Sequence, residues 1–283
     1  MKRCANKIIK GNVCVIIIPV YKEELDVYEL ISLRQVLSVL YNYDICFVTY
    51  KGLSLANYEG LLNQYNVTYY VEYFEEVFFD GVYAYNKLMK DISFYERFLS
   101  YQYMLIYQLD AFVFKDELLY WCSLDYDYIG APWFDMFGEK TEHNTLWAVG
   151  NGGFSLRKIS YFIKVLSWRF PVKKYKIDNI FELKEWRRVA YMLGRKNNMR
   201  YFLKAEDKMN EDVFFTIFLA DSYIPPRLPS VDIAMRFAFE KSPSFLFELN
   251  HQRLPFGCHA FQKYEYHTFW EKYIEDETLN YNH

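Results

Sequence analysis

The run Val13-Cys14-Val15-Ile16-Ile17-Ile18-Pro19-Val20 decides the fold class of this 283-residue chain. It is continuously apolar and rich in β-branched residues, which is typical of a strand buried on both faces of a parallel sheet. Apolar residues then recur at helical spacing over 24–40, and apolar strands are expected over 45–49 and 67–71, with a helix over 53–64 between them. This alternation predicts an α/β fold with parallel strands and crossover helices.

The rest of the chain shows a more irregular pattern. The spacing predicts helices over 82–99, 158–165, 179–193 and 211–220, and strands over 103–109 and 126–129. Residues 134–146 are polar enough to form a mobile loop, and residues 195–200 read as a basic loop. No internal repeat or linker divides the chain, so one domain over 1–283 is expected.

Composition excludes some classes of function. The 33 basic and 36 acidic side chains give a net charge of −3, so nucleic acid is not expected as a partner. The aromatic share of 21% fits either codon bias or rings that stack on bases and sugars. Five scattered cysteines indicate a reducing compartment. The apolar run at 13–20 is too short to span a bilayer, so a cytoplasmic protein is expected.

Asp110 is the first candidate functional residue, because it follows the apolar run over 103–109. Ligands of open α/β sheets bind beyond the carboxyl ends of the strands, so this carboxylate is expected to project into that crevice. A nucleoside diphosphate bound there needs its charge neutralised, usually by Mg²⁺ or Mn²⁺ held by one or two carboxylates. An aspartate that only forms a turn is the alternative explanation.

A glycine cluster, Gly150-Asn151-Gly152-Gly153-Phe154, is the second candidate. Glycines remove side chains where a ligand approaches the backbone, or permit positive φ. A helix that starts near Leu156 would direct free N–H groups toward the same gap, and Trp147 offers a flat face to a sugar ring. A tight structural turn explains the same cluster.

Two further segments carry titratable groups. Glu211 and Asp212 begin an expected hydrophobic helix, where a carboxylate could take the proton of an attacking hydroxyl; the alternative is that acidic residues simply suit the helix dipole. His259 follows a turn near the C-terminus, and imidazole suits Mn²⁺, although a lone histidine is more often structural. His143, in the polar stretch, is not expected to take part.

In this order the segments resemble the donor-binding and catalytic segments of nucleotide-sugar glycosyltransferases with the GT-A fold. Gln108-Leu109-Asp110 is similar to their D-x-D signature, with Gln108 in place of the first aspartate. The resemblance implies that Asp110 and His259 hold Mn²⁺ or Mg²⁺ on the pyrophosphate and that Gln108 contacts the ribose. It also implies that Asp212 is the catalytic base of an inverting transfer and that Glu211 supports it.

The resemblance extends to other parts of the chain. Residues 18–23 resemble the opening I-P-x-Y-N-E turn of family-two-like glycosyltransferases, where nucleobase and ribose lie, with Lys22 replacing the asparagine. Residues 128–133 are similar to the sugar-pocket region of a bacterial glycosyltransferase-like family of unknown function, which has the same motifs over nearly this length. The donor-binding residues implied are Pro19, Tyr21, Glu23, Gln108, Asp110, Trp133, Asn151, Gly152, Gly153 and Phe154. Lys87 is added because it lies on the expected helix that precedes the Asp110 strand, where it could contact the nucleotide or diphosphate.

The resemblance therefore implies a GT-A (Rossmann-like) fold, a mixed, mainly parallel sheet flanked by helices. Residues 1–114 would be the nucleotide-binding half, and residues 115–283 the sugar- and acceptor-binding half. The expected activity is metal-dependent, inverting transfer of a hexose from a nucleoside diphosphate sugar, with UDP expected, to a hydroxyl of a surface polysaccharide, another glycan or a lipid-linked saccharide. Residues 186–188 would seat the enzyme beside a lipid-linked acceptor at the inner face of the membrane, with an ordinary amphipathic helix as the alternative. Residues 134–146 are expected to close over the donor.

Two alternatives stay open, and a third is more distant. A retaining transferase could use the same metal site, with Asp212 binding the acceptor. A catalytically inactive module that binds glycan or nucleotide is compatible with the loss of the first aspartate at Gln108. A nucleotidyltransferase usually carries a glycine-rich loop after its first strand, and residues 19–24 contain no glycine.

Overall fold

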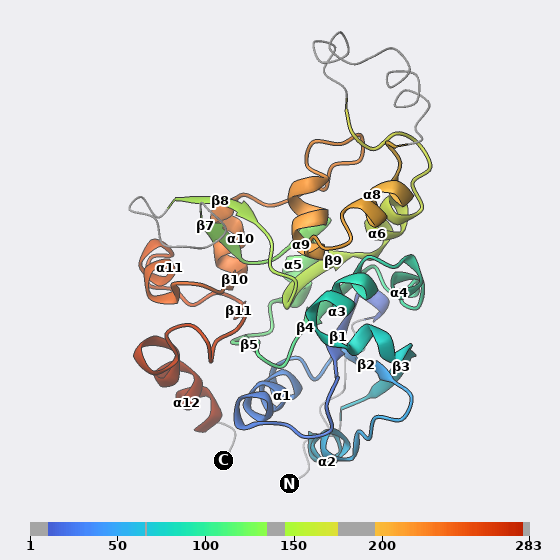
Figure 1. Ribbon diagram of the computed structural model, residues 1–283. Coiled ribbons are helices and arrows are strands. Elements are labelled where there is room, and N and C mark those ends of the chain that lie inside the picture. Colours follow the sequence, from blue (N-terminus) through green and yellow to red (C-terminus); the bar gives the residue numbers. More distant parts are fainter. Residues whose placement is uncertain (1–10, 66, 135–144, 175–195, 280–283) are drawn as a thin grey trace, which may run out of the picture.

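The computed structural model describes residues 11–65, 67–134, 145–174 and 196–279 (Figure 1). Three sequence predictions lie outside these ranges: most of the polar loop over 134–146, which includes His143; the helix over 179–193; and the membrane contact at 186–188. Cys4 also lies outside them, whereas the other four cysteines are buried and form no disulfide with one another.

Within the described residues, six strands form the central sheet in the order β3-β2-β1-β4-β9-β6. The first four of these pair in parallel: β3 (Tyr69–Phe74), β2 (Asp44–Tyr50), β1 (Cys14–Pro19) and β4 (Tyr103–Tyr107). The other two pair antiparallel: β9 (Phe154–Lys158) with β4, and β6 (Tyr128–Ile129) with β9. The predicted fold class, a Rossmann-like α/β fold with a mixed, mainly parallel sheet flanked by helices, is confirmed.

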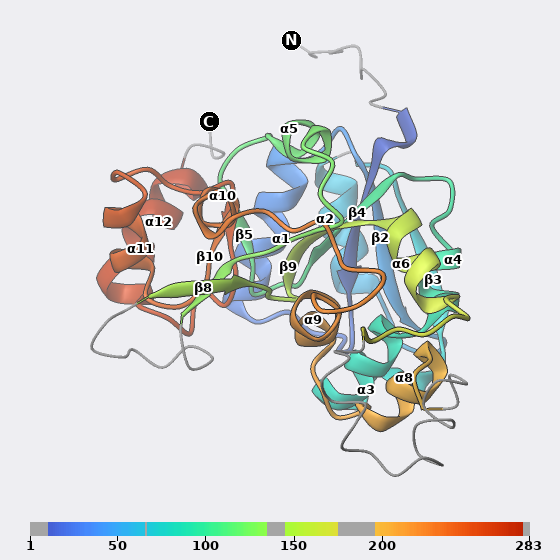
Figure 2. The same ribbon diagram turned by 90° about the horizontal axis from the view of Figure 1, so that it is seen from above.

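The side chains of β1 explain why the sheet is covered on both faces. Ile16 and Ile18 enter one apolar core, whereas Val15 and Ile17 enter the other, because successive strand residues point to opposite faces. The first core is closed by α1 (Val27–Val39), α2 (Ala56–Tyr65) and α5 (Leu118–Ser123). The second is closed by α3 (Gly81–Met89), α4 (Ile92–Glu96), α6 (Ile159–Leu166) and α8 (Met199–Ala205), which lie on the opposite side of the sheet (Figure 2).

Polar caps set where these helices begin. Asp26 accepts hydrogen bonds from the backbone N–H groups of Tyr28 and Glu29, and the Glu29 side chain accepts one from the Asp26 N–H, which fixes the start of α1. The single helix predicted over 82–99 is wrong. Asp91 accepts a hydrogen bond from the Ser93 N–H and starts a new helix, so the segment is divided into α3 and α4.

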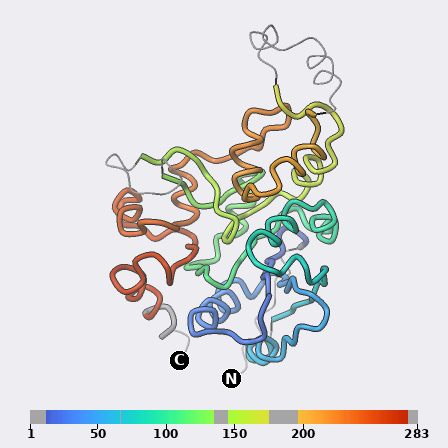
Figure 3. Tube along the Cα trace, in the orientation of Figure 1, coloured from blue at the N-terminus to red at the C-terminus, as the bar shows by residue number. Residues whose placement is uncertain are grey.

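Two smaller sheets stand beside the central one. β5 (Phe112–Val113), β11 (Gly257–Cys258) and β10 (Ala238–Phe239) form a three-stranded sheet, and β7 (Pro132–Phe134) pairs with β8 (Leu146–Val149). A third apolar core joins the three-stranded sheet to α10 (Val231–Phe237), α11 (Pro243–Leu249), η6 (Tyr266–Trp270) and α12 (Glu271–Leu279). The trace in Figure 3 shows the last third of the chain passing from the side of α8 to this separate lobe.

Two predictions about local structure need correction. No helix begins at Leu156: this residue lies in β9, and α6 begins only at Ile159, because β9 completes the sheet between β4 and β6. The expected helix over 211–220 is a short α9 (Glu211–Val213) followed by the π-helical η5 (Phe214–Phe218). Two 3₁₀ turns, η1 (Gly11–Val13) and η2 (Glu76–Phe79), complete the elements discussed here. Among helices in the described ranges, none is long and apolar enough to cross a membrane.

Candidate functional site

The candidate site lies beyond the carboxyl end of β4, as the sequence predicts for Asp110. The Gln108 N–H donates to the Gly153 carbonyl at 2.9 Å, which joins the end of β4 to the glycine turn. Because β9 runs antiparallel to β4, the turn that precedes it falls at this same edge of the sheet. Two segments more than forty residues apart are thereby fixed side by side.

The three-stranded sheet brings a third and a fourth segment to the same edge. Cys258 pairs with Phe112 on one side and with Phe239 on the other, so the next residue, His259, lies between the strand ends that carry Asp110 and Glu240. Backbone bonds hold this arrangement: the His259 N–H donates to Phe239 at 2.9 Å, and the Phe261 N–H donates to the Asp110 carbonyl at 3.3 Å. The site is thus framed by short strands rather than by free loops.

Asp110 and His259 form a pair that fits a divalent cation. The Asp110 Oδ1 atom lies 3.1 Å from His259 Nε2, yet this buried oxygen accepts no hydrogen bond of good geometry among the described residues. Ligand atoms at 2.0–2.1 Å from an octahedral Mg²⁺ lie about 3 Å apart along an edge, and a carboxylate with an imidazole also suits Mn²⁺. No cluster of three His, Cys, Asp or Glu side chains that could hold a metal occurs in the described ranges, so diphosphate or water would complete the shell.

Gly153 makes room for this pair. A Cβ atom on Gly153 would lie 2.0 Å from His259 Nε2 and 2.6 Å from Gln108 Oε1, closer than real Cβ contacts allow. The Gln108 Oε1 atom lies 3.4 Å from the same imidazole nitrogen. The missing side chain therefore lets Gln108 and His259 meet over the turn, which gives the glycine cluster a stronger role than that of a generic tight turn.

Asn151 shapes the turn itself. Its backbone has a positive φ of 72°, which asparagine tolerates better than most residues. Its buried side chain accepts hydrogen bonds through Oδ1 from the N–H groups of Gly153 at 3.0 Å and Phe154 at 3.4 Å. These bonds fix the amide orientation, so Nδ2 faces His259 Nδ1 at 3.1 Å.

Glu211 is part of a buried ion pair. Its Oε1 atom lies 2.6 Å from Arg157 Nη2, and both side chains are almost fully buried. Burial raises the pKa of the Glu211 carboxyl, and the Arg157 guanidinium opposes that shift by stabilising the carboxylate. Arg157 also donates to the Gly152 carbonyl at 3.2 Å. Glu211 thus reaches the glycine turn through Arg157, and its second oxygen, Oε2, is buried with no hydrogen-bond partner in the part of the chain that the structure describes.

Asp212 contacts the glycine turn directly. Its Oδ2 atom accepts a hydrogen bond from the Gly152 N–H at 3.2 Å, and its Oδ1 atom accepts one from the Val213 N–H at 2.8 Å. Burial raises the pKa of Asp212, the bond from Val213 lowers it, and the negative charge of Glu240 raises it further, so the net shift is upward. A raised pKa brings a carboxylate closer to the range that suits proton transfer.

The pKa values of the metal-binding candidates move in opposite directions. Burial raises the pKa of Asp110, but the neighbouring His259 outweighs this effect, and the net shift is downward. Burial lowers the pKa of His259, whereas Asp110 and then Glu240 raise it to about 10. Without a cation, the imidazole therefore carries the positive charge between two carboxylates.

Other predicted site residues lie further from this cluster. Pro19 is buried at the end of β1, Glu23 accepts a hydrogen bond from the Ser54 N–H, and the Lys87 ammonium lies over the Tyr83 ring. Tyr21 is 60% exposed, and its pKa is raised by burial, then by Glu29, with a smaller contribution from Asp110.

Two aromatic candidates pack against the site from within. An added Cβ on Gly150 would lie 2.0 Å from the Trp133 ring, so this indole covers the start of the glycine turn. The side chain of Phe154 is fully buried among Tyr107, Phe237 and Phe256. Only the backbone of Phe154 therefore faces the turn.

Sequence reasoning missed Glu240 and the role of Arg157. Glu240 Oε1 lies 3.3 Å from His259 Nδ1, with side-chain exposures of 16% and 14%. Glu240 follows a two-residue strand, and no local pattern in the sequence points to that strand. Arg157 is recognisable only as a basic residue in an apolar stretch, because its partner Glu211 lies 54 residues away.

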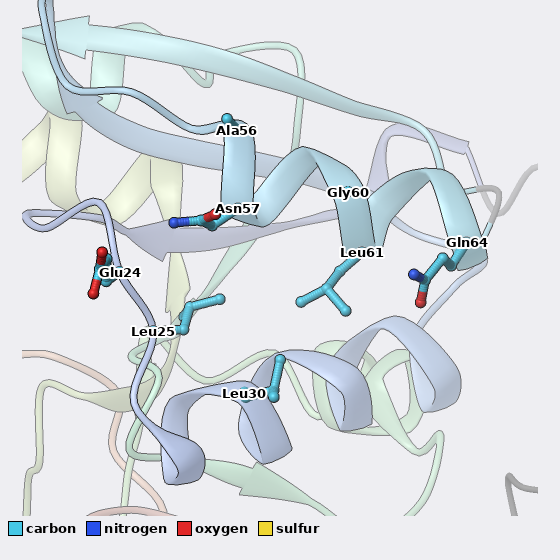
Figure 4. Close-up of a pocket in the computed structure, with 8 residues that line it drawn as sticks. All are labelled: Glu24, Leu25, Leu30, Ala56, Asn57, Gly60, Leu61 and Gln64. Atoms are coloured by element: carbon cyan, nitrogen blue, oxygen red, sulfur yellow. The ribbon is translucent and has the colours of Figure 1, made fainter.

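A separate hollow of about 560 Å³ lies between α1 and α2 (Figure 4). The side chains of Leu25, Leu30 and Leu61 face one another across it, with Glu24 and Asn57 at its rim. It contains none of the predicted site residues and lacks their convergent polar groups.

A family model matches residues 68–259, a range that includes Gln108, Asp110, the glycine turn, Asp212, Glu240 and His259. The family is described as protein of unknown function (DUF5672). The chain belongs to this family. The predicted resemblance to a family of unknown function is confirmed at that level, although the family description names no activity. Among curated proteins, none matches the chain by sequence.

Solved structures show remote similarity to this DUF5672 chain. Core-mannan synthase A from Aspergillus fumigatus, crystallised in a Mn/GDP form, shares 12% identity at a TM-score of 0.39, over 53% of this chain and 60% of that one. The chain thus covers less than two thirds of the mannan synthase. Mouse xyloside xylosyltransferase 1 in its apo form shares 10% identity at a TM-score of 0.42, over 87% and 96%. A197 from STIV shares 12% at 0.34, over 76% and 80%.

Proposed function

We propose that this DUF5672 protein is a metal-dependent, inverting glycosyltransferase. It would move a hexose from a nucleoside diphosphate sugar, with UDP expected, to a hydroxyl of a glycan. The observation that carries the proposal is the convergence of Gln108, Asp110, the turn at 151–153 and His259 at the carboxyl edge of the sheet. Asp212 bonded to Gly152 joins a candidate base to that cluster.

Asp110 and His259 are the residues that would hold Mn²⁺ or Mg²⁺. A bound divalent cation would neutralise the charge of the diphosphate and stabilise it as a leaving group. Gln108 replaces the first aspartate of the D-x-D signature, and its amide carries no negative charge to bind the cation. Its proposed role is therefore a polar contact to the ribose. The 3.4 Å contact between Gln108 and His259 supports a position at the rim of the cation site.

Asp212 is the proposed general base. As the acceptor oxygen bonds to the anomeric carbon, its proton moves to an Asp212 oxygen, and the bond from that carbon to the diphosphate oxygen breaks on the opposite face. The upward pKa shift of Asp212 supports this role. Glu211 would support Asp212 indirectly. It forms an ion pair with Arg157, and Arg157 donates to the carbonyl of Gly152, the residue whose N–H donates to Asp212.

The other donor contacts are proposals from the sequence. Pro19, Tyr21, Glu23 and Lys87 are proposed to bind the base, ribose or diphosphate. Trp133 and the turn at 151–154 would shape the sugar pocket, with Phe154 contributing its backbone.

The acceptor, the location and the domain organisation also remain proposals. A surface polysaccharide or lipid-linked saccharide is the proposed acceptor, at the cytoplasmic face of the membrane. One domain over 1–283, divided into a nucleotide-binding half over 1–114 and a sugar- and acceptor-binding half over 115–283, is proposed. No nucleic-acid partner is proposed.

The second candidate function is a catalytically inactive module that binds nucleotide or glycan. Gln108 in place of an aspartate and a protein donor set of only Asp110 and His259 within the described ranges favour it. Such a module would bind its ligand without turnover. Retaining transfer is a variant of the first proposal, in which Asp212 binds the acceptor instead of taking its proton.

The test is hydrolysis of a panel of UDP- and GDP-sugars, read as released nucleoside diphosphate with Mn²⁺ or with EDTA. We expect Mn²⁺-dependent turnover of one donor and its loss in Asp110→Ala. Asp212→Asn should lower transfer to acceptor by about 10²- to 10⁴-fold, the usual contribution of a general base. Asp232→Asn, an exposed aspartate on α10, is the matched control.

Two results would count against the proposal. Donor binding that is indifferent to EDTA, with no turnover in any combination of donor and acceptor, would establish the inactive module. A product that keeps the anomeric configuration of the donor would exclude the inverting mechanism while leaving glycosyl transfer in place.

A further inference from the structure

Glu240 has no role in the mechanism above, yet it lies against the imidazole that the mechanism uses. Its Oε1 atom is 3.3 Å from His259 Nδ1, on the side of the ring opposite Asp110. The strand register places it there, since Phe239 pairs with Cys258 and the His259 N–H donates to Phe239. The contact is therefore built into the three-stranded sheet.

The two ring nitrogens of His259 need different protonation to bind a cation. A cation on the Asp110 side requires a free lone pair on Nε2, and the ring proton must then reside on Nδ1. Glu240 accepts a proton from Nδ1 but cannot donate one when ionised. This carboxylate thus favours the form of the ring that is ready to bind a cation.

Asn151 favours the opposite form. Its Oδ1 atom is occupied by two backbone N–H groups, so its NH₂ group points to Nδ1 at 3.1 Å. An Nδ1 that accepts from Asn151 carries no proton, and the ring proton then lies on Nε2, facing Asp110 and Gln108. In that form the imidazole cannot coordinate a cation there.

We propose that Glu240 is the positioning residue that keeps the ring proton of His259 on Nδ1, against the competing donor of Asn151, and so makes Nε2 a cation ligand beside Asp110. The inference rests on the proposed function of the site. It deepens that function, because it makes cation binding depend on a carboxylate that does not itself contact the cation.

The test measures cation binding and proton position rather than turnover. Mn²⁺ affinity is measured by calorimetry for wild type, Glu240→Ala, Glu240→Gln and Asp110→Ala. Second-sphere carboxylates typically change metal affinity by 10- to 100-fold, so we expect Glu240→Ala to bind Mn²⁺ about 10- to 100-fold more weakly. Glu240→Gln should retain part of the affinity, because an amide oxygen still accepts from Nδ1. Glu248→Ala, an exposed glutamate on α11, is the matched control.

Nitrogen NMR of histidine-labelled, metal-free protein supplies the second readout, recorded over a pH series that extends above the raised pKa of His259, where its imidazole is neutral. The five histidines are assigned with His259→Gln as reference. In the neutral ring, we expect Nδ1 of His259 to carry the proton in wild type and in Glu240→Gln, and Nε2 to carry it in Glu240→Ala. A merely structural role for Glu240 would not move this proton, and circular dichroism of each variant verifies folding.

Each outcome bears on a different level of the hypothesis. Unchanged Mn²⁺ affinity in Glu240→Ala, or an unmoved proton, overturns the role of Glu240 and leaves the proposed function standing. Loss of binding in Glu240→Ala but not in Asp110→Ala would place the cation on the Nδ1 side, and it also overturns the inference. Wild-type protein that binds no Mn²⁺, with or without UDP, overturns both.

Discussion

At the scale of single residues, Asp212 gives a pH prediction. Its pKa is raised by burial and by the charge of Glu240, and the base must be ionised to work. Transfer should therefore fall as the pH drops through a value above the ordinary aspartate range near 3.9. Glu240→Gln removes one raising charge, so the acid limb of log kcat/KM should move to lower pH, measured at Mn²⁺ concentrations that saturate both proteins. An acid limb that stays in place would show that Asp212 does not set it.

Residues with a local signature could be predicted from the sequence. Asp110 follows an apolar strand, the glycines at 150–153 form a cluster, and Asp212 begins a hydrophobic segment. The structure brings the first two together through the bond from Gln108 to Gly153, and it joins Asp212 through Gly152. Glu240 and Arg157 could not be found, because each acts through a partner distant in sequence.

At the scale of elements, α3 holds the segment that leads into α9. The buried Lys90 ammonium donates to the carbonyls of Glu206, Asp207 and Met209 at 2.8–3.1 Å, and Asn86 Oδ1 accepts from the Glu211 N–H. Lys90→Met leaves three carbonyls without their donor, so the free energy of unfolding should fall by about 1–3 kcal/mol. Urea denaturation measures this loss.

The matched control for Lys90 is Lys204→Met on α8, whose side chain is exposed in the same region. It should change the free energy of unfolding by no more than about 0.5 kcal/mol. An equal effect of both substitutions would mean that the three carbonyl contacts do not stabilise the segment.

Two different causes explain the elements that were predicted wrongly. β9 consists of Phe154–Lys158, and its buried Arg157 breaks the apolar pattern of a central strand. That arginine is tolerated because Glu211 neutralises it from another element. The division between α3 and α4 depends instead on Asp91, which is a favourable N-cap residue. The apolar spacing on both sides of it is helical, and this spacing predicts one continuous helix. The distant ion pair of Arg157 and the local cap at Asp91 thus each outweighed the periodicity of the apolar residues.

At the scale of the whole molecule, donor binding should stabilise the entire chain. The candidate site is formed by residues 108–110, 151–153, 212 and 259, which are far apart in the sequence. Unfolding of any of these segments therefore destroys the site. UDP with Mn²⁺ at 100 times its Kd should add about 2.7 kcal/mol to the free energy of unfolding. Thermal unfolding measures the shift, and EDTA or Asp110→Asn should remove it. A shift that persists in EDTA would contradict the assigned cation site.

The parallel half of the sheet could be predicted, because its strands and helices follow one another along the chain with clear apolar periods. β1, β2, β3 and β4 pair as that alternation requires. The lobe built on β5, β10 and β11 could not, because strands of two residues carry no period. Of the site residues that follow β10 and β11, only His259 could be predicted from the sequence, as an isolated histidine.

The absence of a side chain at Gly153 also bears on how this protein can change over evolutionary time. Any larger residue at that position would collide with both His259 and Gln108. A lineage that replaces the glycine must therefore move or replace both of these side chains. Among related sequences, chains that replace the glycine should therefore also have replaced the histidine.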